Sequence, residues 1–312
     1  MKVRHILATL YFNCIGICLT AQIVNPTPKA LYISPKYFNA DSISAHHVRE
    51  VHLSISNKAD GEIIVNNGKK QVYVFDEGGC MQSYHYTILT NPNYKKKGVA
   101  PKHDTIHTSV FCDSINTIIG KRVKNGDFYS GHYYEYDNQN RVVKKTRFKE
   151  TNANENGDST VFVLGVQKLL SYEKLDYKQL TPTQFKIISY NEDDYPFKSS
   201  IVNYDSSGNL LSKYVEYTVS WMREEYKYTY DNLNRVVTSE IIRYSGKVKK
   251  TRKEYEYNLK GNISVQRNYK QGKLVMEINY LYDNETGLIK SEVNRDHAHN
   301  SIDIVKYKYV LF

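Results

Sequence analysis

The stretch Tyr228–Glu240 reads YTYDNLNRVVTSE, and it decides the fold because its order of residues returns along the chain. Similar stretches read YEYDNQNRVVKKT, NYDSSGNLLSK, YEYNLKGNISVQ and YLYDNETGLIKS. Four tyrosines that each precede an Asp or Asn are spaced 26, 27 and 25 residues apart: Tyr204, Tyr230, Tyr257 and Tyr282. A fixed period of this length indicates a repeat array. An earlier match at Tyr136 extends the array back to about residue 128.

Each repeat contains two turn signals separated by segments with period-two patterning. Tyr226, Tyr228 and Tyr230 fall on one face of such a segment, and the polar residues between them fall on the other. One turn follows the Tyr-Asp pair, and a tighter turn places Gly before Lys, as in KQGKL. Two strands per repeat, reversed by short turns, predict an antiparallel meander.

The chemistry of the turn explains the order of residues. An Asp at the first turn position accepts a hydrogen bond from the backbone two residues on. The fourth position must adopt a left-handed conformation, which Gly does without steric cost and Asn tolerates next best. Asn140 and Asn234 therefore stand where Gly208 and Gly261 stand in other repeats.

The stretches YTYDNLNRVV, NYDSSGNLL and YLYDNETGLI resemble YD repeats, the Tyr-Asp-x-x-Gly-Arg-Leu units of the RHS family of bacterial secreted and surface proteins. The turns QGKLV and SGKVK resemble the hairpin units of MORN-like repeat proteins. The resemblance covers roughly residues 128–293, with the motif arginine present only at Arg141 and Arg235. It implies a curved β shell around a cavity. RHS proteins end in a toxin domain, whereas this chain finishes in the strand-like IVKYKYVLF, so no toxin activity is expected.

The predicted fold is all-β, an antiparallel meander of successive hairpins that forms a long, twisted, curved or partly curled open sheet. We expect a signal peptide at 1–21, an irregular N-terminal β region at 22–120 and the YD-like repeat array at 121–312. The segment 165–175 (GVQKLLSYEKL) is predicted as a strand. A helix is the alternative, because Val166, Leu169 and Leu170 would share one helical face.

The N-terminus has the features of an export signal. Lys2 and Arg4 precede an apolar stretch at 6–19, and Ala21 supplies a small residue for cleavage. The TAQ ending is typical of Bacteroidetes signal sequences, and no later apolar run is long enough for a transmembrane helix. The expected location is periplasmic, outer-membrane-associated or extracellular.

The formal net charge is +10, or about +8 once the two basic residues of the signal peptide are removed. Nucleic acid is an unexpected partner for an exported chain, whereas anionic glycans, envelope lipids and acidic proteins remain candidates. A solvated, lysine-rich β surface that resists edge aggregation explains the same charge.

Two cysteines, Cys80 and Cys112, remain after cleavage of the signal peptide. In an oxidising compartment they can form one disulfide that closes a loop of about 32 residues. Two free, buried thiols are the alternative, because sequence does not reveal the distance between their Cα atoms.

No sequence motif indicates catalysis or a cofactor. Two clusters contain metal-ligating residue types, but neither has a third ligand at a recognised spacing: Asp296, His297 and His299, and His103, Asp104 and His107. The chain contains no HExxH, no G-x-S-x-G and no phosphate-binding glycine loop. We therefore predict a protein that is not an enzyme and holds neither metal nor cofactor.

The tyrosine rows are the one surface predicted to bind a ligand. Rings stacked across neighbouring strands offer a platform for sugar rings or aliphatic chains. The alternative is that the same rings form the core, with each hydroxyl bonded to a neighbour. The candidate binding residues are Tyr226, Tyr228, Tyr230, Tyr255, Tyr257, Tyr280 and Tyr282.

These features predict an exported, non-catalytic repeat protein that acts as a binding or scaffold module in the cell envelope, with a glycan, a protein or an envelope component as partner. A structural assembly component without a small ligand is one alternative. An outer-membrane β-barrel is another, favoured by the terminal Phe312 and the alternating strands. Charges such as Arg267, which a lipid-facing band does not tolerate, argue against it.

Overall fold

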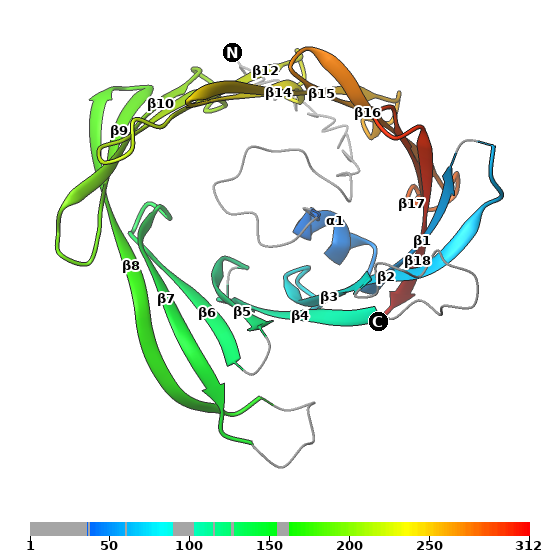
Figure 1. Ribbon diagram of the computed structural model, residues 1–312, viewed down its shortest axis with the longest axis horizontal. Coiled ribbons are helices and arrows are strands. Elements are labelled where there is room, and N and C mark those ends of the chain that lie inside the picture. The colour runs from blue at the N-terminus through cyan, green and yellow to red at the C-terminus, as the bar shows by residue number, and fades with distance from the viewer. Residues whose placement is uncertain are drawn as a thin grey trace, which may run out of the picture.

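The computed structural model describes residues 36, 38–59, 61–89, 103–114, 116–125, 128–154 and 162–312 (Figure 1). The predicted signal peptide lies outside these residues. The elements in chain order are α1 (Ala40–Ala45), β1 (Val48–Ala59), β2 (Val65–Phe75), β3 (Met81–Leu89), β4 (His103–Cys112), β5 (Ile118–Asn125), β6 (Phe128–Tyr136), β7 (Val142–Asn152), β8 (Leu164–Thr181), β9 (Gln184–Tyr190), β10 (Pro196–Tyr204), β11 (Leu210–Tyr217), β12 (Arg223–Tyr230), β13 (Val236–Ser245), β14 (Lys247–Tyr257), β15 (Ile263–Lys270), β16 (Lys273–Tyr282), β17 (Ile289–Asp296) and β18 (Ser301–Leu311).

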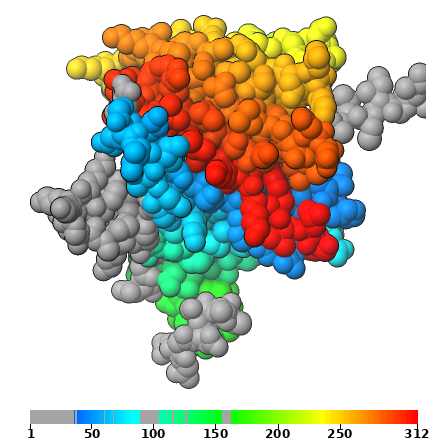
Figure 2. Space-filling model, turned by 90° about the vertical axis from the view of Figure 1, so that its right-hand side faces the viewer, coloured from blue at the N-terminus to red at the C-terminus, as the bar shows by residue number. Residues whose placement is uncertain are grey.

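The strands form one closed β-barrel. Each strand pairs antiparallel with the next in sequence, and β18 pairs with β1, from Val48 opposite Leu311 to Ala59 opposite Ser301. In Figure 2 the C-terminal residues lie directly against the N-terminal strands. The meander of hairpins is confirmed, but the predicted open sheet is wrong. Closure removes the two edges that an open sheet would leave with unpaired backbone groups.

The sheet is continuous across the two regions expected from sequence. Strands β1–β4 come from the predicted N-terminal region and β6–β18 from the predicted repeat array, and all belong to the same 18-stranded sheet. The segment 165–175 lies within β8, so the strand prediction there is confirmed.

The Tyr-Asp turns have the predicted local chemistry. In the turn after β12, the carboxylate of Asp231 accepts hydrogen bonds from the backbone N–H groups of Leu233 (3.0 Å) and Arg235 (2.9 Å). Asn234 adopts a left-handed conformation, with φ of 59°. The turn after β10 repeats this arrangement, with Gly208 at φ of 83° in the equivalent place. Short-range turn chemistry therefore sets each reversal of the chain.

Several tyrosine hydroxyls fasten a strand to the strand before it, and three of these tyrosines, Tyr230, Tyr257 and Tyr282, directly precede a turn. The Tyr257 hydroxyl donates to the carbonyl oxygen of Val236 at 2.7 Å, and Val236 is the first residue of the preceding outgoing strand. The Tyr230 hydroxyl makes the same contact with Leu210 at 2.8 Å. Tyr282, Tyr309 and Tyr177 donate to Ile263, Ile289 and Val142 in the same way. These bonds satisfy polar groups that would otherwise be buried without partners.

A short N-terminal segment packs against the inner wall of the barrel. Figure 1 shows α1 inside the ring of strands. Phe38 and Ile43, which flank and belong to α1, pack with Val51, Tyr73 and other buried residues of β1–β4. Because side chains alternate between the two faces of a strand, this contact identifies the row that faces the lumen. The intervening residues face outward.

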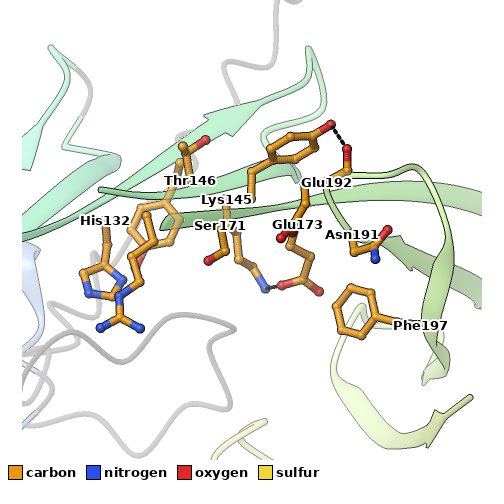
Figure 3. Close-up of a pocket in the computed structure, with 11 residues that line it drawn as sticks. His132, Lys145, Thr146, Ser171, Glu173, Asn191, Glu192 and Phe197 are labelled. Atoms are coloured by element: carbon orange, nitrogen blue, oxygen red, sulfur yellow. Dashed lines mark hydrogen bonds and ion pairs between the residues drawn. The ribbon is translucent and has the colours of Figure 1, made fainter. Parts of the chain in front are cut away.

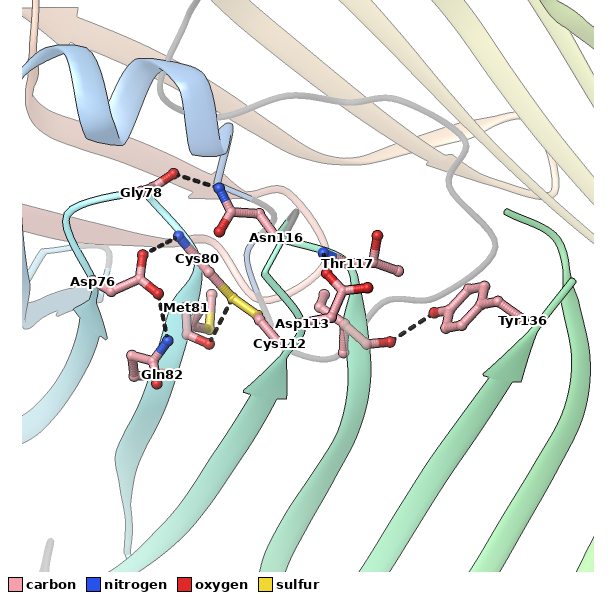
Figure 4. Close-up of a disulfide and its surroundings, with 11 residues drawn as sticks. Asp76, Gly78, Cys80, Met81, Gln82, Cys112, Asp113, Asn116, Thr117 and Tyr136 are labelled. Carbon is pink, nitrogen blue, oxygen red and sulfur yellow. Dashed lines mark hydrogen bonds between the residues drawn. A yellow bond between two sulfur atoms is a disulfide. The ribbon is translucent and has the colours of Figure 1, made fainter. Parts of the chain in front are cut away.

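A disulfide fastens two neighbouring hairpin turns near α1 (Figure 4). Cys80, just before β3, is bonded to Cys112 at the end of β4, with 6.7 Å between their Cα atoms. Beside it, Gly79 has φ of 82°, and a side chain there would collide with the backbone carbonyl of Ala40 in α1. A glycine is therefore required for the helix to approach the turn this closely.

Candidate functional site

The structure places the predicted tyrosines on the inner face of the barrel. Six of the seven meet in one packed cluster, namely Tyr228, Tyr230, Tyr255, Tyr257, Tyr280 and Tyr282. Tyr255 and Tyr280 are buried, with 7% and 9% of their surface exposed. These six rings therefore pack as core, the alternative that the sequence left open. A role for any of them in ligand binding stays a prediction.

Tyr226 lies apart from this cluster. Its hydroxyl donates to Glu224 at 2.6 Å, and the residue opposite it on β11 is Lys213. Glu224 also accepts from Arg243 at 2.7 Å. The seventh predicted tyrosine thus belongs to a charged part of the lumen.

A row of basic side chains crosses β5, β6 and β7 on the lumenal face. Val110 of β4 packs in the cluster that contains Phe38 and Ile43, so it faces the lumen. Lys121 lies opposite Val110, His132 opposite Lys121 and Arg147 opposite His132. Directly opposed residues in an antiparallel sheet share a face. This row therefore places a lysine, a histidine and an arginine on the lumenal face.

A second row continues across β7 to β11. Lys145 and Lys198 both contact the carboxylate of Glu173, at 3.1 Å and 2.5 Å. Lys213 lies further along, opposite Val202 of β10. It makes no ion pair with any residue in the part of the chain that the structure describes, and the same is true of Lys121. We call the two rows together the basic lumen wall: Lys121, His132, Lys145, Arg147, Lys198 and Lys213, with Glu173 as the one carboxylate among them.

The pKa values along this wall reflect an excess of positive charge. Burial lowers the pKa of Lys213, the neighbouring Lys198 and Lys145 lower it further, and Glu173 and Glu224 offset only part of this effect. Burial also lowers the pKa of His132, assisted by Lys121 and Arg147. A histidine beside two cations is thereby kept neutral near pH 7.

The same positive charges stabilise the ionised form of Glu173. Burial alone would raise its pKa, but Lys145 and Lys198 outweigh burial and bring the pKa to about 2. The carboxylate therefore stays ionised at any physiological pH and neutralises part of the wall. The next lumenal carboxylate, Glu224, is already bound to Arg243.

A cavity opens against the basic lumen wall (Figure 3). Its volume is about 580 Å³, and its lining includes His132, Tyr134, Lys145, Arg147, Glu173 and Phe197. In Figure 3 the side chains of Lys145 and Glu173 point toward each other, and the ring of Phe197 lies nearby. Space for a ligand thus adjoins cations and aromatic rings.

The outer face of β12–β16 carries a network of ion pairs. Tyr255 is a core residue and lies opposite Gln266, so the adjacent Arg267 faces outward. Arg267 binds Glu277 at 3.0 Å and also contacts Glu256. Further outward pairs join Lys250 to Glu240 and Lys227 to Glu225. A sheet face with such a network is suited to water, since a lipid-facing band is apolar.

Sequence reasoning missed the cations of the lumen wall. Lys145, Arg147 and Lys149 alternate along β7, which is a period-two signal for one basic strand face. From the sequence alone this pattern indicates a solvated surface, because lysines and carboxylates alternate on many segments of the chain. Only the register across β5–β11 shows that these cations gather on one side.

The metal candidates lie in exposed or outward positions. His299 contacts Asp296 at 2.8 Å within the turn between β17 and β18. The ring of His107 lies against that of His85 at a tilt of 35°, with 5.1 Å between ring centroids. Among the described residues, no three His, Cys, Asp or Glu side chains are grouped so as to hold a metal ion. In the same part of the chain, no helix has the length and apolar character needed to cross a membrane.

The geometry defines a closed antiparallel barrel with a basic lumen, and comparisons give it distant neighbours. The sequence matches no protein-family model and no curated protein. A solved porin-like protein from Bacteroides uniformis aligns at 9% identity over 84% of this chain and 98% of that one, with a TM-score of 0.39. A porin-like protein from Bacteroides vulgatus aligns at 8% identity over 65% and 94%, with a TM-score of 0.30.

A third neighbour is the TcdB2-TccC3 protein without its hypervariable C-terminal region. It aligns at 12% identity over 71% of this chain and 13% of that chain, with a TM-score of 0.28. All three TM-scores lie below 0.5. The barrel and its lumen are therefore defined by the strand pairing and side chains of this chain itself.

Proposed function

We propose that this protein is an exported, non-catalytic β-barrel of the cell envelope that binds a ligand in its lumen. One observation carries the proposal: ion pairs such as Arg267 with Glu277 lie on the outer face of β12–β16, while a cavity of about 580 Å³ lies on the inner face beside two lysines, Lys121 and Lys213, that have no ion pair among the described residues. Such a barrel works in water and offers its ligand an enclosed, polar surface. The turns that resemble YD repeats support a shell built by repetition of one hairpin unit.

The outer-membrane barrel is the second candidate. Closure of an even number of antiparallel strands around a polar interior favours it, since bacterial outer-membrane barrels share both properties. The outward position of Arg267 and its two carboxylate partners opposes it, because charged side chains on a lipid-facing surface are destabilising.

Behaviour without detergent separates the two candidates. The chain from Gln22 onward is produced in the oxidising periplasm of a bacterial host and purified in buffer alone. We expect a monodisperse, β-rich protein that does not float with lipid vesicles. If the protein aggregates in buffer and folds only in detergent or vesicles, the outer-membrane barrel is the correct candidate.

A further inference from the structure

We infer that the basic lumen wall binds an acidic oligosaccharide, a sugar chain that carries carboxylate or sulfate groups. This inference rests on the proposed function and adds the chemical class of its ligand. It is carried by the unbalanced charge of the wall, by the length of the wall and by the aromatic rings that lie between its cations.

The charge of the wall calls for an anion. Five lysine and arginine side chains face one carboxylate, Glu173, which already contacts two of them. Lys213 and Lys121 form no ion pair among the described residues, although Glu173 and Glu224 lie near enough to Lys213 to offset part of the repulsion it feels. Gathering like charges in a partly buried place is unfavourable unless a counter-charge occupies it. A bound anion would relieve the repulsion between Lys213 and its neighbours Lys198 and Lys145.

The extent of the wall calls for several anionic groups in a row. The cations run from Lys121 on β5 to Lys213 on β11, which are six strand spacings apart. Neighbouring strands lie about 4.8 Å apart, so the wall is roughly 29 Å long around the inside of the barrel. A single phosphate or carboxylate would engage only one end of it. An extended chain with repeated negative charges would engage both rows.

The aromatic residues favour a sugar chain over other polyanions. Tyr134 lies opposite Lys145, and Tyr226 lies opposite Lys213. Phe197 lies beside Lys198, with its ring centroid 5.3 Å from the ammonium nitrogen. Cations paired with rings can hold an acidic group and the apolar face of the adjoining sugar ring together.

The binding test uses the purified mature chain and four probes. Calorimetry or fluorescence titration measures binding of a defined acidic oligosaccharide, such as an oligogalacturonate, of a neutral glucan of equal length, of inorganic sulfate and of polyglutamate of comparable charge. We expect the acidic oligosaccharide to bind most tightly, with affinity that falls as salt is raised. Inorganic sulfate is expected to bind far more weakly, because it reaches few of the cations.

Matched variants locate the site. Lys213→Gln and Arg147→Gln should each weaken binding of the acidic oligosaccharide by about tenfold, the effect of losing one charge-assisted contact. Lys308→Gln removes a charge from the outer face of β18 and should leave affinity unchanged. Lys213→Gln should also unfold no more readily than wild type, because it relieves repulsion within the wall. Loss of binding in this variant would then not reflect failure to fold.

Several outcomes would overturn the inference. Equal binding of the neutral glucan would remove the requirement for charge, and equal binding of polyglutamate would remove the requirement for sugar. An equal loss of affinity in Lys308→Gln would indicate adsorption to the whole surface, and no binding by any probe would exclude this ligand class. None of these outcomes tests the proposed function itself. If the barrel is monodisperse in buffer, the proposal of a water-exposed barrel stands even when the ligand class is wrong. If the barrel needs detergent, that proposal fails as well.

Discussion

The guanidinium of Arg235 stacks on the ring of Tyr257, with 4.2 Å between its central carbon and the ring centroid. Arg235 belongs to one Tyr-Asp turn and Tyr257 to the next, so the contact joins consecutive repeats. The same guanidinium binds Asp231 of its own turn at 2.6 Å. Arg141 stacks in the same way on Tyr177, at 4.6 Å, and binds its own Asp137. The motif arginine thus links neighbouring hairpins.

The first prediction concerns this link. Arg235→Ala should lower the free energy of unfolding by about 1–2 kcal/mol, because it removes a cation–π contact and an ion pair in which two guanidinium nitrogens contact one oxygen of Asp231. Arg235→Lys should recover only part of this loss, since an ammonium group cannot reproduce the planar stacking. Urea unfolding followed by circular dichroism measures both. Arg295→Ala, on the exposed outer face of β17, is the control. An equal effect of the two alanine variants would contradict the assigned role.

The second prediction concerns the left-handed residue of the turn. Asn234→Ala should destabilise the protein by about 1 kcal/mol, because alanine resists positive φ. Asn234→Gly should be close to neutral, since glycine adopts the conformation freely but loses the hydrogen bond that the Asn234 side chain accepts from Asn209 at 3.0 Å. The comparison of the two variants by thermal unfolding isolates the backbone effect. If alanine and glycine behaved alike, strain at this turn would not limit stability.

The third prediction is a dependence of stability on pH at Glu173. Its pKa in the folded protein is about 2, below the ordinary value of 4.5. The stabilisation it provides is therefore complete above pH 4.5 and is lost as pH falls toward 2. Glu173→Gln should cost about 2 kcal/mol at neutral pH, less than a fully buried pair would give because water partly screens it. The difference from wild type should shrink as acid is added.

Urea titrations at several pH values test this dependence. Glu216→Gln serves as the matched control, because Glu216 forms an exposed ion pair with Arg223 at 3.5 Å. The control should differ little from wild type at any pH. A difference between wild type and Glu173→Gln that stayed constant down to pH 3 would show that the carboxylate does not neutralise the wall.

The fourth prediction concerns the disulfide. Replacing Cys80 and Cys112 by Ser should lower the free energy of unfolding by about 2–4 kcal/mol, the range for a cross-link of this loop length. A reductant should shift the unfolding of wild type toward that of the double variant and should not affect the double variant itself. Identical unfolding of wild type with and without reductant would mean that the bond does not constrain the unfolded chain.

The sequence predicted those parts of the fold that depend on neighbouring residues. Asp231 and Asn234 predict a turn because the Asp231 side chain and the Asn234 backbone form it directly. The pairing of Leu53 with Tyr307, which closes the barrel, depends on strands from opposite ends of the chain. Nothing within either strand shows that the other will lie beside it, so an open sheet was the natural expectation.

The basic lumen wall could not be predicted from the sequence for a related reason. Lys213 faces inward and Arg252 faces outward, yet both occur in strands that alternate Tyr, Lys and Glu. With charges on both faces, the pattern along one strand does not say which face is inside. The inward face is identified by Phe38 and Ile43, which pack against β1–β4 in the folded barrel and lie outside the strand pattern itself.

The seam between β1 and β18 also sets the order in which the chain can fold. Each of the other pairings joins adjacent strands and can form as a local hairpin. The seam joins residues such as Asn57 and Asp303, which are 246 positions apart. Bringing such distant segments together costs roughly 5 kcal/mol of chain entropy. We therefore expect closure to come last, and a chain that has not yet closed displays two open strand edges to neighbouring molecules while it folds.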